Sequence, residues 1–198
     1  RLLDSVLNEV KRVVARGYTE IVLIGIHIAS YGVDLGNGVD LLSLIHAVSE
    51  IDGVKRIRLG SIEPMLFSEE FVKGLVEIRT FCPHFHLSLQ SGCDTVLSRM
   101  GRKYTTVQYA QIVKRVRCAF DYPSITTDIM VGFPGETEEE FEKTIAFVEQ
   151  IHFYKVHVFK YSRRKGTKAG VFPDQVPEDI KTERSHRLIQ RISRLREA

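Results

Sequence analysis

The chain has 198 residues, of which 43% are hydrophobic and 27% charged, and its formal net charge at pH 7 is +3. These values are ordinary for a globular protein, and the length allows one sizeable core but not two full domains. No apolar run approaches the roughly 20 residues that cross a bilayer, and no signal-peptide pattern opens the chain, so we expect a cytoplasmic protein without membrane contact.

The hydrophobic pattern alternates helices and strands along the chain. Apolar residues recur at helical spacing over 1–16, and the run 20–26 (EIVLIGI) is typical of a strand that is buried on both faces. Further helices are predicted over 40–51, 68–78, 94–100, 106–120 and 137–151, and further strands over 54–59, 84–89, 125–131 and 154–161. This order predicts an α/β fold with parallel strands joined by right-handed crossovers, and a partial (β/α) barrel fits it better than a flat sheet.

The two ends of the chain differ from this repeating pattern. The first predicted helix has no strand before it, so we expect the first strand of the barrel and the loop after it to be missing. The other end contains Pro173 and Pro177 and then a long basic helix from about Glu178. We therefore expect a core over 1–172, truncated at its start, and a linker with a basic helix over 173–198.

The stretch 126–141 (TTDIMVGFPGETEEEF) predicts a strand, a tight turn and a helix. Gly132 to Gly135 ends the strand, and Thr137 with Glu140 three residues later is a capping box. Such a turn leaves bare backbone at the carboxyl end of a strand, where α/β folds place ligands. A well-capped turn without a ligand explains the same residues.

Polar residues follow every predicted strand at its carboxyl end. They are Gly25 with His27, Ser61 with Glu63, Gln90 with Ser91, Gly132 with Glu136, and Tyr161 to Arg164. In a (β/α) barrel these five sets converge on one mouth, so we expect a ligand site there.

The residue types leave the chemistry of this site open. His27 suits a general base or a structural role, and Glu63 and Glu136 suit an acid–base pair unless Glu136 only caps a helix. The cysteines Cys82, Cys93 and Cys118 have no CxxC spacing, so no metal site is predicted. From residue 160 onward 11 Lys and Arg stand against 5 Asp and Glu, which suits a polyanionic partner or a solvated helix face.

Five motifs match one family. GIHIASYG (25–32), RLGSIEP (58–64), LSLQSGCDTVLSRMGRKYT (87–105), TDIMVGFPGET (127–137) and YSRRKGTKA (161–169) resemble the radical S-adenosylmethionine methylthiotransferases over nearly all of residues 1–170. The His27 motif and SIEP are most similar to the enzymes that modify threonylcarbamoyladenosine in tRNA. Sister groups act on isopentenyladenosine in tRNA or on a ribosomal protein aspartate.

The resemblance implies a partial barrel that binds S-adenosylmethionine beside a [4Fe–4S] cluster held by a CxxxCxxC motif, with sulfur delivered from a second cluster. This chain has no such cysteine triad, so we expect it to be inactive by itself, with the cluster ligands elsewhere in the full-length enzyme. The family's second-cluster and RNA-binding domains are also absent from it. The expected partners are tRNA and S-adenosylmethionine, and the expected state is a monomer.

The resemblance also assigns roles to single residues. It implies cofactor binding by Gly25, His27, Glu63, Gln90, Ser91, Asp128 and Gly132, and substrate binding by Arg163, Arg164 and Lys165. No catalytic side chain is assigned. From the turn itself, we expect Gly132→Val to weaken cofactor binding while the fold survives.

Two alternative functions, and the role of the basic residues on the closing helix, remain open. The chain could be a metal-independent barrel lyase or isomerase that uses His27, Glu63 and His86, or a non-enzymatic RNA-binding module that uses the basic end. The closing helix carries an arginine stripe, formed by Arg184, Arg187, Arg191 and Arg194. The stripe would face RNA phosphates, pair with acidic residues of the core, or simply solubilise the helix.

Overall fold

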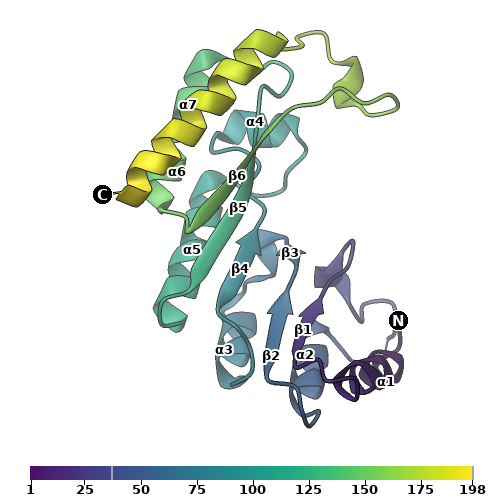
Figure 1. The fold of residues 1–198 in the computed structure, drawn as a ribbon. Helices are drawn as coiled ribbons and strands as arrows, with labels where there is room; N and C mark the ends of the chain where they lie inside the picture. The colour runs from purple at the N-terminus through teal and green to yellow at the C-terminus, as the bar shows by residue number, and fades with distance from the viewer. Residues whose placement is uncertain (37, 198) are drawn as a thin grey trace. The chain divides into compact units, whose positions relative to one another are not determined.

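The computed structural model describes residues 1–36 and 38–197 and separates into two compact units. Unit 1 consists of residues 1–86 and 114–124, and unit 2 of residues 87–113 and 125–198. Figure 1 shows the helices and strands of both units. Among the described helices, none is both long and apolar enough to cross a membrane.

Unit 1 begins with two helix–strand repeats. Its elements are α1 (Leu3–Val14), β1 (Glu20–Leu23), the short helix η1 (Ile28–Ser30), α2 (Leu41–Ser49), β2 (Arg56–Leu59), β3 (Ser61–Ile62), η2 (Pro64–Leu66), α3 (Glu69–Glu77) and most of β4 (His84–Leu87). Strands β1 and β2 pair in parallel, with Glu20 opposite Arg56 and Leu23 opposite Leu59. Ile57 of β2 also bridges in parallel to Phe81.

Two helices of unit 1, α2 and α3, begin at residues whose side chains cap them. The Asp40 carboxylate accepts a hydrogen bond from the Ser43 amide at 2.7 Å, and the Ser68 hydroxyl accepts one from the Phe71 amide at 3.1 Å. Behind the strands, Phe67 meets Phe71 and Phe85 edge-on at 5.6 and 5.5 Å between ring centroids.

Unit 2 holds the longest strand and the closing helix. Its elements are α4 (Asp94–Arg99), most of α5 (Thr106–Ala119), β5 (Ser124–Val131), α6 (Glu138–Ile151), β6 (Lys155–Lys160), η3 (Ala169–Val171) and α7 (Glu178–Glu197). Strands β5 and β6 are parallel, with Thr126 opposite Lys155 and Val131 opposite Lys160. The predicted capping box of α6 is present, and α7 packs against both α6 and β6.

The predicted helices and strands are confirmed in type and order, with differences at their ends. The first strand stops at Leu23 rather than at Ile26, and Ile24 and Ile26 are strongly exposed. The two-residue strand β3 and the three short helices were not predicted, because segments this short carry no readable period.

Candidate functional site

In unit 1, a large cavity opens where β1 ends. It has a volume of about 820 Å³, within the range of small-molecule sites, and Gly25 and His27 line it together with apolar residues of α1 and β1. Among the described residues, the backbone of Gly25 and of Ile26 makes no hydrogen bond, and both residues are exposed. The Gly25 carbonyl is therefore available to a ligand amine, as the family pattern implies.

A second cavity of unit 1 brings two predicted site residues together. It has a volume of about 300 Å³, and His27, Ser30, Ser61 and Glu63 contribute its polar groups. His27 and Glu63 come from segments that follow different strands, β1 and β3. Residues of the GIHIASYG and SIEP segments thus line one pocket.

In unit 2, Gln90 adopts a strained backbone just past β4. Its φ is 72°, in the left-handed region that side chains other than glycine rarely occupy. The Gln90 amide donates to the Asp128 carbonyl at 2.8 Å, and the Gln90 carbonyl accepts from the Met130 amide at 2.9 Å. Strand β5 therefore holds Gln90 and Asp128 side by side, and such maintained strain is typical of functional sites.

Ser91 is turned into the protein. It is fully buried, its hydroxyl lies 3.2 Å from the Thr144 hydroxyl, and it accepts a hydrogen bond from the Cys93 amide at 3.2 Å. The Gly92 amide also donates to Thr144, at 3.2 Å. As placed here, the Ser91 side chain links the start of α4 to α6 and offers no exposed atom to a ligand.

Gly132 is less open than the sequence suggested. Its φ is 71°, and its amide donates to Oε2 of Glu136 at 2.6 Å. A Cβ added at this position would lie 2.3 Å from Cγ of Lys181. The left-handed backbone and the Lys181 contact both oppose a side chain here, so Gly132→Val should destabilise the protein, and survival of the fold in that variant stays a prediction.

Glu136 is a buried salt-bridge residue. Its side chain is 1% exposed, and its Oε2 lies 2.9 Å from a guanidinium nitrogen of Arg184. Burial raises the pKa of this carboxyl, while the Gly132 amide and Arg184 act in the opposite direction. The cap of α6 is Thr137, so Glu136 does not cap the helix.

The arginine stripe of α7 does not face solvent as a free surface. Arg184 and Arg187 both pair with Glu138, Arg187 also pairs with Glu142, and Arg191 pairs with Glu149 at 2.9 Å. The reading in which these side chains contact RNA is therefore wrong for Arg184, whose side chain is 5% exposed, whereas for the partly exposed Arg187 and Arg191 it stays a prediction. The alternative reading, pairing with acidic residues of the core, is confirmed for these three.

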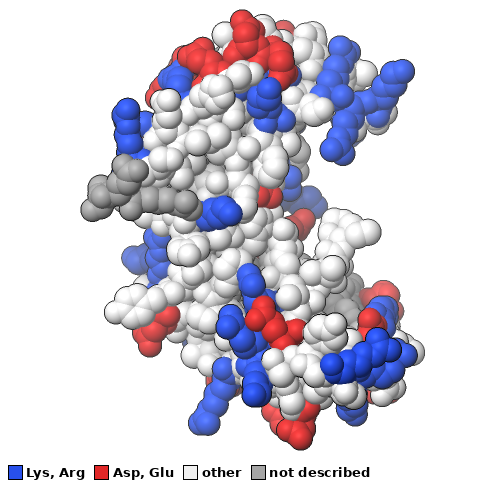
Figure 2. All heavy atoms as spheres, in the orientation of Figure 1, with Lys and Arg blue, Asp and Glu red and all other residues white. Residues whose placement is uncertain are grey.

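The loop after β6 keeps its basic side chains exposed. Arg163 donates from Nε to the Gly170 carbonyl at 2.7 Å, and the Arg164 carbonyl accepts from the Thr167 hydroxyl at 2.9 Å. Within the described part of the chain, the side chains of Arg164, Lys165 and Lys168 form no ion pair. Figure 2 shows blue side chains gathered over this loop, which suits contact with a polyanion.

The cysteines do not fit a four-iron cluster. Cys82 is half-buried, Cys93 buried and Cys118 exposed, and all three are free thiols. In the described ranges, no three His, Cys, Asp or Glu side chains are placed to hold a metal ion. The residues of this chain therefore do not supply the thiolate set that such a cluster needs.

Comparison with known proteins gives consistent matches. The sequence model of the Radical SAM superfamily matches residues 1–148. The chain is 39% identical over 97% of its length to tRNA-2-methylthio-N(6)-dimethylallyladenosine synthase of Clostridium novyi, and 40% identical over 94% to that of Pelotomaculum thermopropionicum. It covers only 42% of either relative. The names of these relatives do not support the threonylcarbamoyladenosine subgroup to which the motifs pointed.

Solved structures show the same fold at low sequence identity. Coproporphyrinogen III oxidase of Escherichia coli, a radical SAM enzyme, matches 98% of this chain and 46% of its own with a TM-score of 0.70 and 14% identity. A radical S-adenosylmethionine methyltransferase of Kitasatospora setae, solved with cobalamin and a [4Fe–4S] cluster, matches 86% of this chain and 33% of its own with a TM-score of 0.68 and 21% identity. The predicted α/β fold of the radical SAM barrel type is thereby confirmed.

Proposed function

The chain belongs to the radical SAM superfamily, and on that premise we propose that the protein it contributes to is a methylthiotransferase acting on an adenosine of tRNA. The observation that carries the proposal is the 38–40% identity, over nearly the whole chain, to relatives named as tRNA methylthio-adenosine synthases. It favours this activity over a metal-independent lyase and over a non-enzymatic RNA-binding module.

Members of the superfamily use S-adenosylmethionine together with a [4Fe–4S] cluster. We propose that the Gly25 carbonyl accepts from the cofactor's ammonium group, because it is exposed and unpaired among the described residues at the 820 Å³ cavity. His27 and Glu63, on the smaller cavity, and Gln90, Ser91, Asp128 and Gly132 in unit 2 complete the proposed set. For Ser91 and Gly132 this role is through the backbone, since the Ser91 side chain is buried and Gly132 has none.

Two modified adenosines are candidates for the substrate. The names of the relatives favour dimethylallyladenosine, whose added group is a hydrocarbon. Threonylcarbamoyladenosine carries hydrogen-bonding groups, and the smaller cavity offers it His27, Ser30 and Ser61 alongside apolar residues. We take dimethylallyladenosine as the first candidate and threonylcarbamoyladenosine as the second.

The test is activity of the full-length enzyme on two tRNA substrates. One carries dimethylallyladenosine and the other threonylcarbamoyladenosine, and nucleoside mass spectrometry detects the added methylthio group. Methylthiolation of either one supports the proposal and identifies the nucleoside. An enzyme that binds S-adenosylmethionine but modifies neither tRNA contradicts it.

The basic loop gives a second test, of the partner. We propose that Arg163, Arg164 and Lys165 contact RNA phosphates and that the segment 173–198 leads into an RNA-binding domain. Changing the three residues together to Ala should weaken tRNA binding and lower the slope of log affinity against log salt, by up to about one per residue. A matched control removes three other exposed charges, Lys11, Arg12 and Arg16 of unit 1. Equal effects of the two triple variants would contradict a specific role for the loop.

A further inference from the structure

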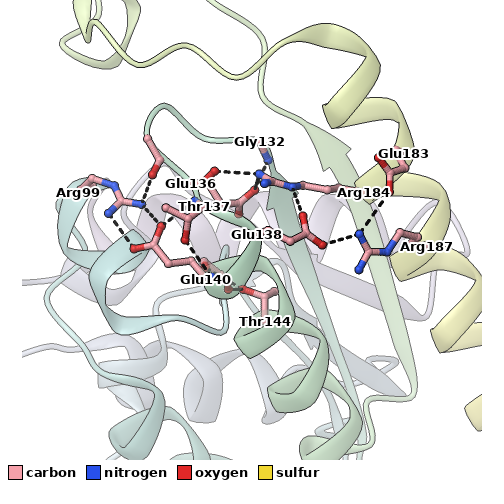
Figure 3. A network of polar contacts seen from close by, with 12 residues as sticks. Arg99, Gly132, Glu136, Thr137, Glu138, Glu140, Thr144, Glu183, Arg184 and Arg187 are labelled. Carbon is pink, nitrogen blue, oxygen red and sulfur yellow. Dashed lines mark hydrogen bonds and ion pairs between the residues drawn. The ribbon is translucent and has the colours of Figure 1, made fainter.

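Helix α7 holds the turn between β5 and α6 through one buried arginine. The Arg184 side chain is 5% exposed, and its Nη1 donates to the Glu136 carboxylate at 2.9 Å and to the Glu136 backbone carbonyl at 3.0 Å. Its Nε lies 3.4 Å from the Glu138 carboxylate. Figure 3 shows Arg184 reaching from α7 toward Glu136 and Gly132.

The Glu136 carboxylate connects Arg184 to Gly132, because it accepts hydrogen bonds from both. The same oxygen, Oε2, accepts from Arg184 and from the Gly132 amide at 2.6 Å, whereas Oε1 is buried without a hydrogen-bond partner in the described structure. A buried carboxylate that loses the cation bonded to it moves toward water or takes up a proton. Either change would weaken the hold of Glu136 on the Gly132 amide.

The rest of the turn is held by neighbours that do not involve Glu136. The Gly135 amide donates to the Asp174 carbonyl at 2.7 Å, and the Gly135 carbonyl accepts from Arg99 at 3.1 Å. Lys181, one helical turn before Arg184, lies over Gly132. Removal of the Arg184 guanidinium should therefore loosen the Gly132 end of the turn while Asp174 and Arg99 still hold the Gly135 end.

We propose that Arg184 is a positioning residue for cofactor binding: acting through Glu136, it sets where the Gly132 backbone lies. This inference rests on the proposed function, in which Gly132 borders S-adenosylmethionine. It assigns α7 a role in the binding site although none of its residues was expected there.

Arg187 provides a matched control on the same helix. Both arginines pair with Glu138, and both lie over the Phe141 ring, at 5.4 Å for Arg184 and 5.1 Å for Arg187. Of the two, only Arg184 is bonded to Glu136 in the described contacts. Arg184→Met and Arg187→Met thus remove a similar charge and stacking contact but differ at the turn.

The experiment compares these variants in the full-length enzyme by two measurements. Hydrogen exchange of the peptide covering 131–137 reports the turn, and equilibrium dialysis reports S-adenosylmethionine affinity. Arg184→Met should raise exchange in this peptide and lower the affinity, each by about tenfold or more, because bonds to a buried charge are lost. Arg187→Met should leave both within about twofold of wild type.

Each result decides a separate question. Unchanged hydrogen exchange in Arg184→Met overturns the inference. Raised exchange with wild-type affinity for S-adenosylmethionine also overturns it, but leaves the proposed function standing. If the wild-type enzyme does not bind S-adenosylmethionine, the proposed function is contradicted, and so is the role of Arg184 in cofactor binding. If Arg184→Met unfolds, as shown by lost protection in residues 125–130, the same two measurements are made on Arg184→Lys. Lysine keeps the positive charge but not the paired contact of the guanidinium with the carboxylate and the backbone carbonyl of Glu136. Wild-type exchange and affinity in Arg184→Lys overturn the inference, and a smaller loss of both supports it.

Discussion

Gly132→Ala should destabilise the protein more than an ordinary substitution at a left-handed glycine. The backbone at Gly132 has a φ of 71°, and a residue with a Cβ pays about 1–2 kcal/mol in this region. The new methyl carbon would also lie 2.3 Å from Cγ of Lys181, which is 7% exposed and so has little room to move. Overpacking of this kind costs about 1–3 kcal/mol, so we expect a loss of about 2–5 kcal/mol in the free energy of unfolding.

Two further variants separate the two contributions. Gly101 has a φ of 74°, but a Cβ added there meets no atom within 4 Å, so Gly101→Ala should lose only the backbone part, about 1–2 kcal/mol. Lys181→Ala removes the side chain that the new methyl overlaps. In a double-mutant cycle, Lys181→Ala should therefore recover about 1–3 kcal/mol in the Gly132→Ala background.

The assay is urea unfolding followed by circular dichroism, with free energies extrapolated to water. The m value should stay constant among the variants, because the surface exposed on unfolding barely changes. The reasoning is refuted if Gly132→Ala costs no more than Gly101→Ala. It is equally refuted if Lys181→Ala and Gly132→Ala are simply additive, since the overlap would then contribute nothing.

Two other predictions concern pH and metal content. The hydrogen bond from Arg99 lowers the pKa of Glu140 to about 2 from 4.5, so the stabilisation that this carboxylate contributes is complete above pH 4.5 and is lost as the pH falls toward 2. When the free energy of unfolding is measured against falling pH, it should therefore fall less steeply for Glu140→Gln than for wild type. Identical slopes would refute this. The 198-residue chain purified by itself should carry no stoichiometric iron or sulfide, because Cys82, Cys93 and Cys118 do not form a cluster ligand set; a brown protein with both elements would contradict this.

The sequence by itself determined the elements whose signals are local. Apolar residues at a period of about 3.6 residues identified the main helices, and unbroken apolar runs identified the strands. Both patterns depend on residues only a few positions apart. The capping box of Thr137 and Glu140 was readable for the same reason, because both partners lie within one helical turn. The family motifs also lie within short stretches, and they identified the superfamily without the structure.

Only the tertiary structure decided which partners the polar residues have. The bond between Glu136 and Arg184 joins residues 48 positions apart, and the contact of Ser91 with Thr144 joins residues 53 apart. The sequence did contain one signal of this helix pairing. Acidic residues recur along α6 and basic residues along α7, and the pairs that form are Arg187 with Glu138 and Glu142, and Arg191 with Glu149. Matching stripes of opposite charge predict helix pairing only when the two helices are known to be neighbours. That neighbourhood comes from packing α7 against α6 and β6, which no local pattern specifies.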